Sequence, residues 1–336
     1  MIVGTALVAT SAHAQDPTPA WRGPLPVENL RPYQSIFLHL SPESPTTLAR
    51  GQRRYGLQLD MANNLLIPNT GANGARVEED FEVQRLRFSY HRGLKGGLEA
   101  GVTLPLVARN SGVLDGPIEL YHRLLGLGGD GRDNPQGRDD ISRGRSVLFF
   151  RDAQGNGLDA GSAFGIGDVS LSLKKPLTQG RFATAARIAL KLPTASSHKV
   201  LGSGGVDFGG GINARYVVTR RLALYGTAGA LAFGNADVVP NARRSGLQGT
   251  LGLEYRGRRG SFVAQTDAAT RNVRTGNSFA DRTPIVVSVG YKRPVGKNRL
   301  FWVSFSENGD YHNFHAPFFG NIGPDFTLST GFEWRH

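Results

Sequence analysis

Apolar and polar residues alternate through the last twelve positions of the chain, residues 325–336. Phe326, Leu328, Phe332 and Trp334 lie at even-numbered positions, and polar, charged or glycine residues separate them. An extended strand sends successive side chains to opposite faces, so this segment predicts a strand with one apolar and one polar face. About a dozen segments show the same pattern, as a closed barrel in a lipid bilayer requires.

The alternation predicts an all-β, closed antiparallel transmembrane barrel of about 12 strands, with a range of 10–14. Links after every second strand are short and basic or glycine-containing, whereas the links between them are longer and polar. This arrangement is typical of short periplasmic turns and long outer loops in a bacterial outer membrane. The strands are expected at about 53–64, 80–91, 97–108, 166–176, 182–192, 206–218, 222–233, 246–256, 261–271, 284–293, 300–307 and 325–336.

Two soluble architectures, the β-sandwich and the β-propeller, also contain many alternating strands. The chain shows no self-similar repeat of fixed period, which argues against a propeller. A second regularity favours the membrane barrel, because aromatic residues gather at the short-turn end on the outward face, where rings prefer the headgroup level. These membrane-interface aromatics are Tyr55, Tyr90, Phe182, Tyr216, Tyr225, Tyr255, Phe262, Tyr291, Phe301 and Trp334.

The inward positions of the predicted strands carry charges of both signs. Such an interior can line a water-filled pore, enclose a ligand cavity or be packed closed by ion pairs, and the pattern does not choose among the three. The candidate lumen-lining residues are Arg85, Arg87, Glu99, Asp168, Lys174, Arg187, Lys191, Asp207, Arg215, Glu254, Asp267, Lys292 and Glu333.

The N-terminal region precedes the regular strands. Residues 1–14 are mostly apolar and small and end in Ala12-His13-Ala14, which indicates the remnant of a secretory signal peptide. Residues 15–49 are rich in proline and polar residues and form either a lumenal or periplasmic segment or a disordered leader. The barrel itself is expected over residues 50–336.

The chain has a formal net charge of +12 and contains no cysteine. The absence of cysteine excludes disulfides and thiolate metal sites. The positive charge either serves solubility or attracts anionic partners such as lipopolysaccharide phosphates or a small anionic or amphiphilic solute. No pattern of a nucleic-acid-binding module is present. The expected location is the outer membrane, reached by export through the periplasm, and the oligomeric state is left open.

The long polar stretch 107–165 is expected to be a loop, and residues 117–125 within it can form a short helix. This loop either folds into the lumen as a constriction or lies outside the barrel. The segment after it, Gly165-Ile-Gly-Asp168, opens a strand on which Asp168 and Lys174 both face inward. We expect them to form an internal ion pair at the barrel rim; the alternative is that they select solutes.

The sequence offers few signs of covalent chemistry. His312 and His315 are spaced as a metal pair but lie in a loop, and residues 152–159 resemble a calcium loop that lacks the glutamate ligand at its twelfth position. His91 and His198 have serines nearby in sequence, which leaves a lipid-modifying hydrolase as an alternative. No cofactor and no metal are expected. The leading hypothesis is a non-enzymatic, passive channel or binding barrel for a small solute, and a structural or adhesion barrel is the third alternative.

Three short segments carry a family resemblance: Gly23-Pro-Leu-Pro26, Gly165-x-Gly-Asp-x-x-Leu-x-Leu-Lys174 and Ala189-Leu-Lys-Leu-Pro-Thr194. The chain resembles domain-of-unknown-function family 3187 over most of its length. It is also similar to the meta-pathway phenol-degradation barrels, which are regarded as outer-membrane channels. The resemblance implies an outer-membrane barrel and supplies no functional residues.

Overall fold

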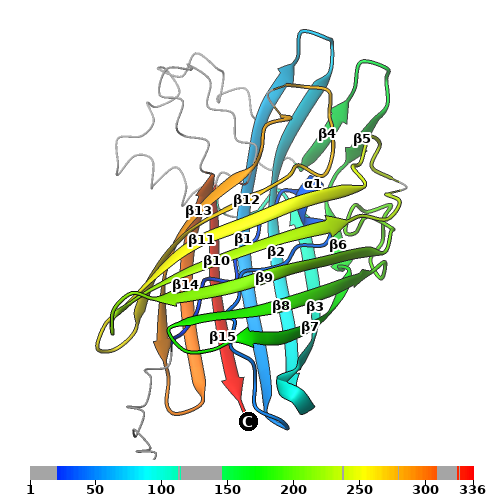
Figure 1. Ribbon diagram of the computed structural model, residues 1–336. Coiled ribbons are helices and arrows are strands. Elements are labelled where there is room, and N and C mark those ends of the chain that lie inside the picture. The colour runs from blue at the N-terminus through cyan, green and yellow to red at the C-terminus, as the bar shows by residue number, and fades with distance from the viewer. Residues whose placement is uncertain are drawn as a thin grey trace, which may run out of the picture.

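The structure is a computed structural model that describes residues 21–112, 114, 146–236, 238–278, 280–308, 324 and 326–336. Twelve antiparallel strands close into a barrel (Figure 1). The prediction of an all-β transmembrane barrel of about 12 strands is confirmed. The strands of the ring, in order around it, are β1 (Arg53–Thr70), β2 (Arg76–Gly93), β3 (Glu99–Asn110), β7 (Val169–Thr178), β8 (Phe182–Leu192), β9 (Asp207–Val217), β10 (Leu222–Ala232), β11 (Ser245–Arg256), β12 (Ser261–Ala269), β13 (Ile285–Pro294), β14 (Arg299–Asn308) and β15 (Phe326–Arg335).

The ring closes between the first and the last strand. β1 pairs with β15 from Arg54 opposite Arg335 to Asn63 opposite Phe326, and β15 also pairs with β14. Each ring strand therefore has a neighbour on both sides. A closed ring removes the unpaired backbone edges that hydrocarbon would penalise.

Three additional short strands lie in the stretch that was expected to be a loop. β4 (Val147–Arg151) extends the outer part of β2, β5 (Gly157–Ala160) pairs with β4, and β6 (Ala163–Ile166) pairs with the end of β3. Asp152 shapes the β4–β5 turn, because its Oδ1 accepts hydrogen bonds from the backbone N–H groups of Gln154 and Asn156 at 2.9 Å each. The helix expected at residues 117–125 lies outside the described residues.

The outward face of the ring is apolar. Large hydrophobic side chains on it are exposed, among them Phe88 on β2, Leu251 on β11 and Val289 on β13. Aromatic rings gather where the short turns are: Tyr55 stacks on Trp334 with centroids 5.5 Å apart, and Phe262 lies 4.9 Å from Tyr291. An apolar belt bounded by aromatic rings matches the surface that a bilayer covers. Among the described residues, no helix is long and apolar enough to cross a membrane.

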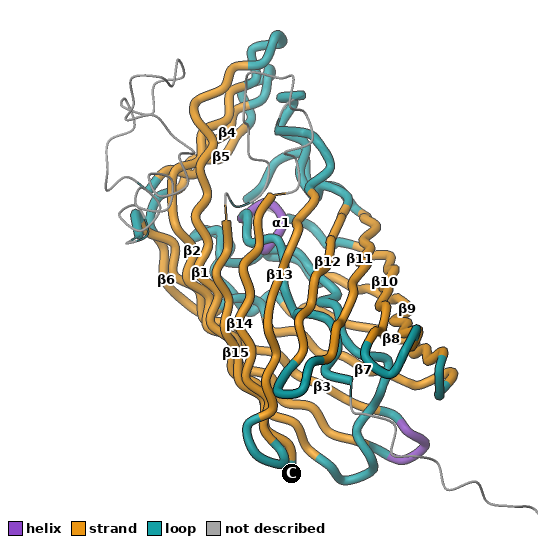
Figure 2. The backbone as a smooth tube through the Cα atoms, turned by 90° about the vertical axis from the view of Figure 1, so that its left-hand side faces the viewer, coloured by secondary structure: helices purple, strands orange, loops and turns teal. Residues whose placement is uncertain are grey.

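The lumen holds a hairpin formed by residues 21–52, which we call the lumenal hairpin. Residues 21–23 lie near the short β11–β12 turn, where the N–H of Gly23 donates to the Glu254 carboxylate. The chain then rises to α1 (Pro32–Ser35), enclosed by the wall (Figure 2), and returns to the short-turn end, where the N–H of Gly51 donates to the carbonyl of Gly93 at 2.9 Å. A single 3-10 turn, η1 (Lys95–Gly97), links β2 to β3 at this end.

The main hydrophobic core lies at the hairpin tip, residues 30–40, in the outer part of the barrel. Tyr33 packs edge-on against Phe150 of β4 at 5.4 Å, and Phe37 contacts Phe233 at 5.0 Å. All four rings are buried. The outer part of the lumen is therefore closed by the same kind of apolar packing that fills soluble cores.

Glycines on the inward face let the hairpin approach the wall closely. A Cβ at Gly229 of β10 would lie 2.7 Å from Leu40 Cδ1, and one at Gly290 of β13 would lie 2.8 Å from Leu25 Cδ2. Since contacts this short do not occur between real carbon atoms, a side chain at either position would force the leucine to move.

Candidate functional site: the lumen and its short-turn vestibule

The structure places all thirteen candidate lumen-lining residues around the inward side of the ring. Arg187 and Glu333 are half-buried, and the other eleven are buried. Most of them contact the lumenal hairpin or one another in three ion-pair networks.

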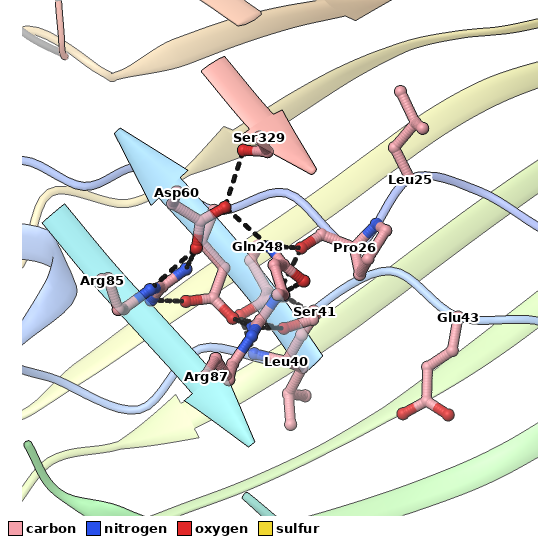
Figure 3. Close-up of polar contacts among 12 residues, drawn as sticks. Leu25, Pro26, Leu40, Ser41, Glu43, Asp60, Arg85, Arg87, Gln248 and Ser329 are labelled. Carbon is pink, nitrogen blue, oxygen red and sulfur yellow. Dashed lines mark hydrogen bonds and ion pairs between the residues drawn. The ribbon is translucent and has the colours of Figure 1, made fainter. Parts of the chain in front are cut away.

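The first network lies mid-lumen on β1 and β2 (Figure 3). Arg85 donates to Asp60 Oδ2 at 2.9 Å, and both Arg85 and Arg87 form ion pairs with Glu28 of the hairpin. Arg87 also donates to the carbonyl of Pro26 at 2.6 Å. Burial raises the pKa of Glu28, but the two guanidinium groups outweigh burial and hold that pKa well below its usual range. Glu28 is therefore a charged anchor of the hairpin.

The second network lies closer to the short turns. Lys174 of β7 donates to Glu43 of the hairpin at 2.7 Å and lies 3.3 Å from Glu99, and Arg187 of β8 pairs with Glu43 at 2.7 Å. Arg54 pairs with Glu99 at 2.9 Å. Burial raises the pKa of Glu43, but the charges of Arg187 and Lys174 outweigh it and lower the pKa from 4.5 to about 2.

The third network lies at the outer rim. Lys191 of β8 lies 2.5 Å from Asp168 and 3.3 Å from Asp207, and Asp207 also accepts the N–H of Leu38 at 2.8 Å. The expected pair between Asp168 and Lys174 is wrong, because the two side chains find different partners. Asp168 precedes β7 at the rim, whereas Lys174 lies further along the strand, where the hairpin brings in Glu43.

Glu254 of β11 and Asp267 of β12 hold the first arm of the hairpin in different ways. The Glu254 carboxylate accepts the N–H groups of Arg22 and Gly23 at 3.1 Å and the hydroxyl of Tyr225 at 2.8 Å. Asp267 accepts from wall residues, Thr250 at 2.5 Å and Gln265 at 2.9 Å. Gln265 in turn accepts the N–H of Leu25 at 2.8 Å, so both carboxylates help to hold the start of the hairpin.

Between the hairpin arms and the wall, at the short-turn end, lies a cavity of about 510 Å³ that we call the vestibule. Wall and hairpin both line it, and seven of its lining side chains are arginine or lysine, against two carboxylates. A second cavity of about 100 Å³ lies mid-lumen beside the hairpin tip. The two cavities share the lining residues Ser41, Arg87, Thr103 and Arg187, so they meet beside the first and second ion-pair networks.

Nine of the ten predicted interface aromatics lie on the outward face, five of them exposed and four half-buried. Tyr225 is the exception and corrects the prediction: its side chain is 3 % exposed and its hydroxyl donates to Glu254 inside the lumen. The alternation in β10 is weak because alanine and glycine occupy many positions. Leu231, on the same face as Tyr225, packs against the hairpin tip, so this part of the lumen is apolar. The assumption that apolar side chains face the lipid therefore assigns this face of β10 to the wrong side.

The hairpin residues that complete these networks, Glu28 and Glu43, were not among the sequence candidates. Their only signal in the sequence is that they are the two carboxylates of residues 21–52, a segment otherwise rich in proline. Trp302 of β14 was also missed; it is buried with Leu25, Val27 and Val263 and lies over Gly331. Alternation marked Trp302 as inward but gave no reason for an aromatic ring there.

Those residues considered for covalent or metal chemistry that the structure describes do not assemble a site. His91 contacts Glu99 at 3.3 Å, and in the described part of the chain neither His91 nor His198 is hydrogen-bonded to a serine. The described part of the chain contains no group of three metal-ligating side chains. His312 and His315 lie outside the described residues.

Comparison with known proteins places the chain in a family. The model of the family described as protein of unknown function (DUF3187) matches residues 1–335. The chain belongs to this family. No curated protein matches the sequence.

Among solved structures, the COG4313 outer membrane channel from Pseudomonas putida F1 is similar to the DUF3187 chain at a TM-score of 0.59 and 13% identity, covering 89% of this chain and 100% of that one. The NanC porin reaches a TM-score of 0.45 at 6% identity, with coverage of 83% and 98%, and the Ralstonia pickettii toluene transporter TbuX reaches 0.39 at 13%, with coverage of 86% and 90%. Only the first likeness is strong enough to bear on the fold. Together with the closed ring and its apolar belt, it identifies this DUF3187 protein as a β-barrel of the bacterial outer membrane.

Proposed function

We propose that this protein is a passive outer-membrane channel or binding barrel for a small anionic or amphiphilic solute, with no covalent chemistry. The observation that carries the proposal is the vestibule of about 510 Å³, which lies within a lumen of charged side chains. This volume falls in the range of small-molecule sites, and fixed charges along a lumen select permeating solutes. The likeness to a barrel described as an outer membrane channel supports a transport role through the shared fold.

The lumenal hairpin makes this barrel a restricted channel rather than an open pore. Its tip is packed into the outer part of the lumen, and its arms are bound to the wall by Glu28 and Glu43. Solute passage therefore requires the hairpin to shift, and the ion pairs of Glu28 set how easily it does so. Exchange of one charged partner in such a pair leaves two buried guanidinium groups without their common carboxylate.

Planar-bilayer conductance tests the proposal. We expect low conductance from the wild-type barrel and a several-fold increase from Glu28→Gln, with chloride carrying more current than potassium in a salt gradient. Asp159→Asn, on the exposed strand β5, removes the same charge as Glu28→Gln and is the control for a general change of charge. A folded wild-type barrel and a folded Glu28→Gln barrel that both fail to conduct would exclude the channel and leave only a binding barrel.

The lipid partners follow from the two surfaces of the barrel. The apolar belt contacts acyl chains, and basic residues at the outer end, including Arg151 and Arg244, are positioned to meet lipopolysaccharide phosphates. We expect the barrel to bind lipopolysaccharide more weakly once its phosphates are removed, and equal binding would argue against this contact. Residues 1–14 act as an export signal in this proposal and lie outside the described residues.

A further inference from the structure

Arg215 is a buried cation that has no carboxylate partner among the described residues. The residue lies on β9, is 7 % exposed and lines the vestibule. One of its Nη atoms donates to the carbonyl of Gly180 at 3.3 Å, and its Nε has no hydrogen-bond partner. Within the described residues no carboxylate forms an ion pair with it. A buried guanidinium in this state is costly unless an anion joins it.

Other buried cations of the lumen show what Arg215 lacks. Arg85, Lys174 and Lys191 each lie within 2.9 Å of a carboxylate oxygen. The nearby acid Glu254 already accepts hydrogen bonds from the hairpin backbone and from Tyr225, the residue paired with Arg215 across the β9–β10 ladder. The wall and the hairpin thus neutralise these cations and leave Arg215 for another group.

Lys292 extends the positive region. This residue of β13 is 3 % exposed and lines the vestibule. Its ammonium donates to two carbonyl oxygens of the described chain, those of Pro24 at 2.6 Å and Arg22 at 3.1 Å. Of the two carboxylates in the lining, Glu43 is shared by Lys174 and Arg187. The vestibule therefore holds an excess of positive charge that the described residues do not balance.

Part of the vestibule lining is apolar, beside serine, threonine and glutamine side chains. Trp21, Trp302 and several prolines of the hairpin, among them Pro24, Pro26 and Pro42, form part of its surface. The indole N–H of Trp21 is buried and has no acceptor, which adds a second unused donor. Apolar surface with a few converging donors is typical of sites for organic ligands.

We propose that the vestibule binds a small organic carboxylate with an apolar body, with its carboxylate on Arg215 and its body against the tryptophan and proline surface. The site deepens the proposed function by naming the chemical class of the solute, and it rests on that function only for its role in transport. Arginine suits this task because its planar fork can hold both oxygens of a carboxylate.

Tryptophan fluorescence of the full-length barrel in detergent tests the site, because two of the three tryptophans line it. Benzoate, 3-phenylpropionate and octanoate are titrated as amphiphilic probes. Acetate and inorganic phosphate are the control anions that lack an apolar body, and benzyl alcohol is the control that has an apolar body but no charge. We expect saturable binding of at least one amphiphilic probe, at least tenfold weaker binding of acetate, phosphate and benzyl alcohol, and at least tenfold weaker binding of the amphiphilic probe to Arg215→Gln.

Two further variants separate loss of the Arg215 guanidinium from a general change of charge. Arg258→Gln removes the same charge from the exposed β11–β12 turn and should bind as wild type, whereas Arg215→Lys keeps the charge without the fork and should fall between wild type and Arg215→Gln. Heat-modifiable gel mobility reports whether each variant is a folded barrel. Should Arg215→Gln misfold, Arg215→Lys carries the test alone, and wild-type affinity in it would overturn the assignment.

The site is overturned if none of the amphiphilic probes binds, if folded Arg215→Gln binds them as wild type does, or if phosphate binds as tightly as they do. Failure of the channel proposal is a separate result. A barrel that binds the probe but conducts no ions supports the binding site and excludes the channel. A barrel that conducts ions but binds no probe supports the channel and excludes the binding site.

Discussion

The tip and the arms of the lumenal hairpin meet the same barrel by different physical means. The tip, residues 30–40, buries Tyr33, Phe37 and Leu38 against wall and loop side chains. The arms, residues 21–28 and 41–52, have a smaller apolar cluster, in which Leu25 and Val27 pack against Trp302 and Val263. They are otherwise held by polar contacts, through Glu28 and Glu43 and through backbone groups that bond to wall residues such as Glu254. Apolar packing excludes water at the outer end, whereas polar anchoring leaves a vestibule at the short-turn end.

The difference shows how one segment can both close a barrel and leave a binding site in it. Close packing is intolerant of gaps, so the tip fixes the position of the hairpin. Ion pairs and hydrogen bonds tolerate neighbouring water, so a gap can remain between the arms and the wall at the vestibule. Changes in the tip should therefore act on stability and closure, and changes near the arms on charge and binding.

Phe37→Ala should have the largest effect on stability. Removal of the ring that contacts Phe233 at 5.0 Å leaves a cavity in the packed tip and should cost about 4 kcal/mol of unfolding free energy. Urea unfolding in lipid vesicles measures the loss. Affinity of Arg215 for the organic carboxylate should stay within twofold of wild type, and a large drop in that affinity would show that tip and arms do not act separately.

Glu28→Gln should lower the unfolding free energy by about 3 kcal/mol, because Arg85 and Arg87 lose a buried carboxylate. The same urea experiment measures it, alongside the conductance described above. Equal stability of Glu28→Gln and wild type would mean that Asp60 alone neutralises this part of the wall.

The ion pairs of Glu43 predict a dependence of stability on pH. Since its pKa is lowered from 4.5 in the ordinary state to about 2 in the folded barrel, its contribution is complete above about pH 4.5 and is lost as the pH falls toward 2. The shift corresponds to about 3 kcal/mol. Urea midpoints at pH 6 and pH 3 should differ less in Glu43→Gln than in wild type, and parallel losses in both would assign the effect to other carboxylates.

Tyr225→Phe should have the smallest effect, a loss of about 1 kcal/mol, because it removes one hydrogen bond to a carboxylate that keeps its other donors. Tyr255→Phe is the matched control, since Tyr255 lies on the outward face and is 45 % exposed. Equal effects of the two substitutions on urea unfolding would contradict the inward position of Tyr225.

The barrel could be predicted from the sequence because alternation reports the two sides of the wall directly. Phe182–Leu192 forms β8 over the range that its apolar residues indicate, and the inward charges lie where the pattern puts them. β10 was misread because its lumenal side is apolar, for a reason supplied by a segment almost two hundred residues earlier in the chain. Local patterning contains no information on such a distant partner.

The candidate site was predictable only in part for the same reason. Arg215 and Lys292 could be named as inward cations, but their lack of a carboxylate depends on which acids the hairpin and the wall use elsewhere. Residues 21–52 have no periodicity of their own, since their structure follows from contacts with the lumen. A proline-rich segment that carries two carboxylates and precedes a barrel with charged inward positions is the signal that could have indicated a plug.

The two ends of the lumenal hairpin leave the barrel on the same side, residue 21 beside the β11–β12 turn and residue 52 beside the β2–β3 link. The segment is therefore inserted as a loop and not passed through the ring from one opening to the other. It can be withdrawn toward the periplasm without parting any two strands, and for the same reason it can enter after the first and last strands have joined. Closure of the wall and insertion of the hairpin can thus be consecutive steps, and the second can be reversed without undoing the first.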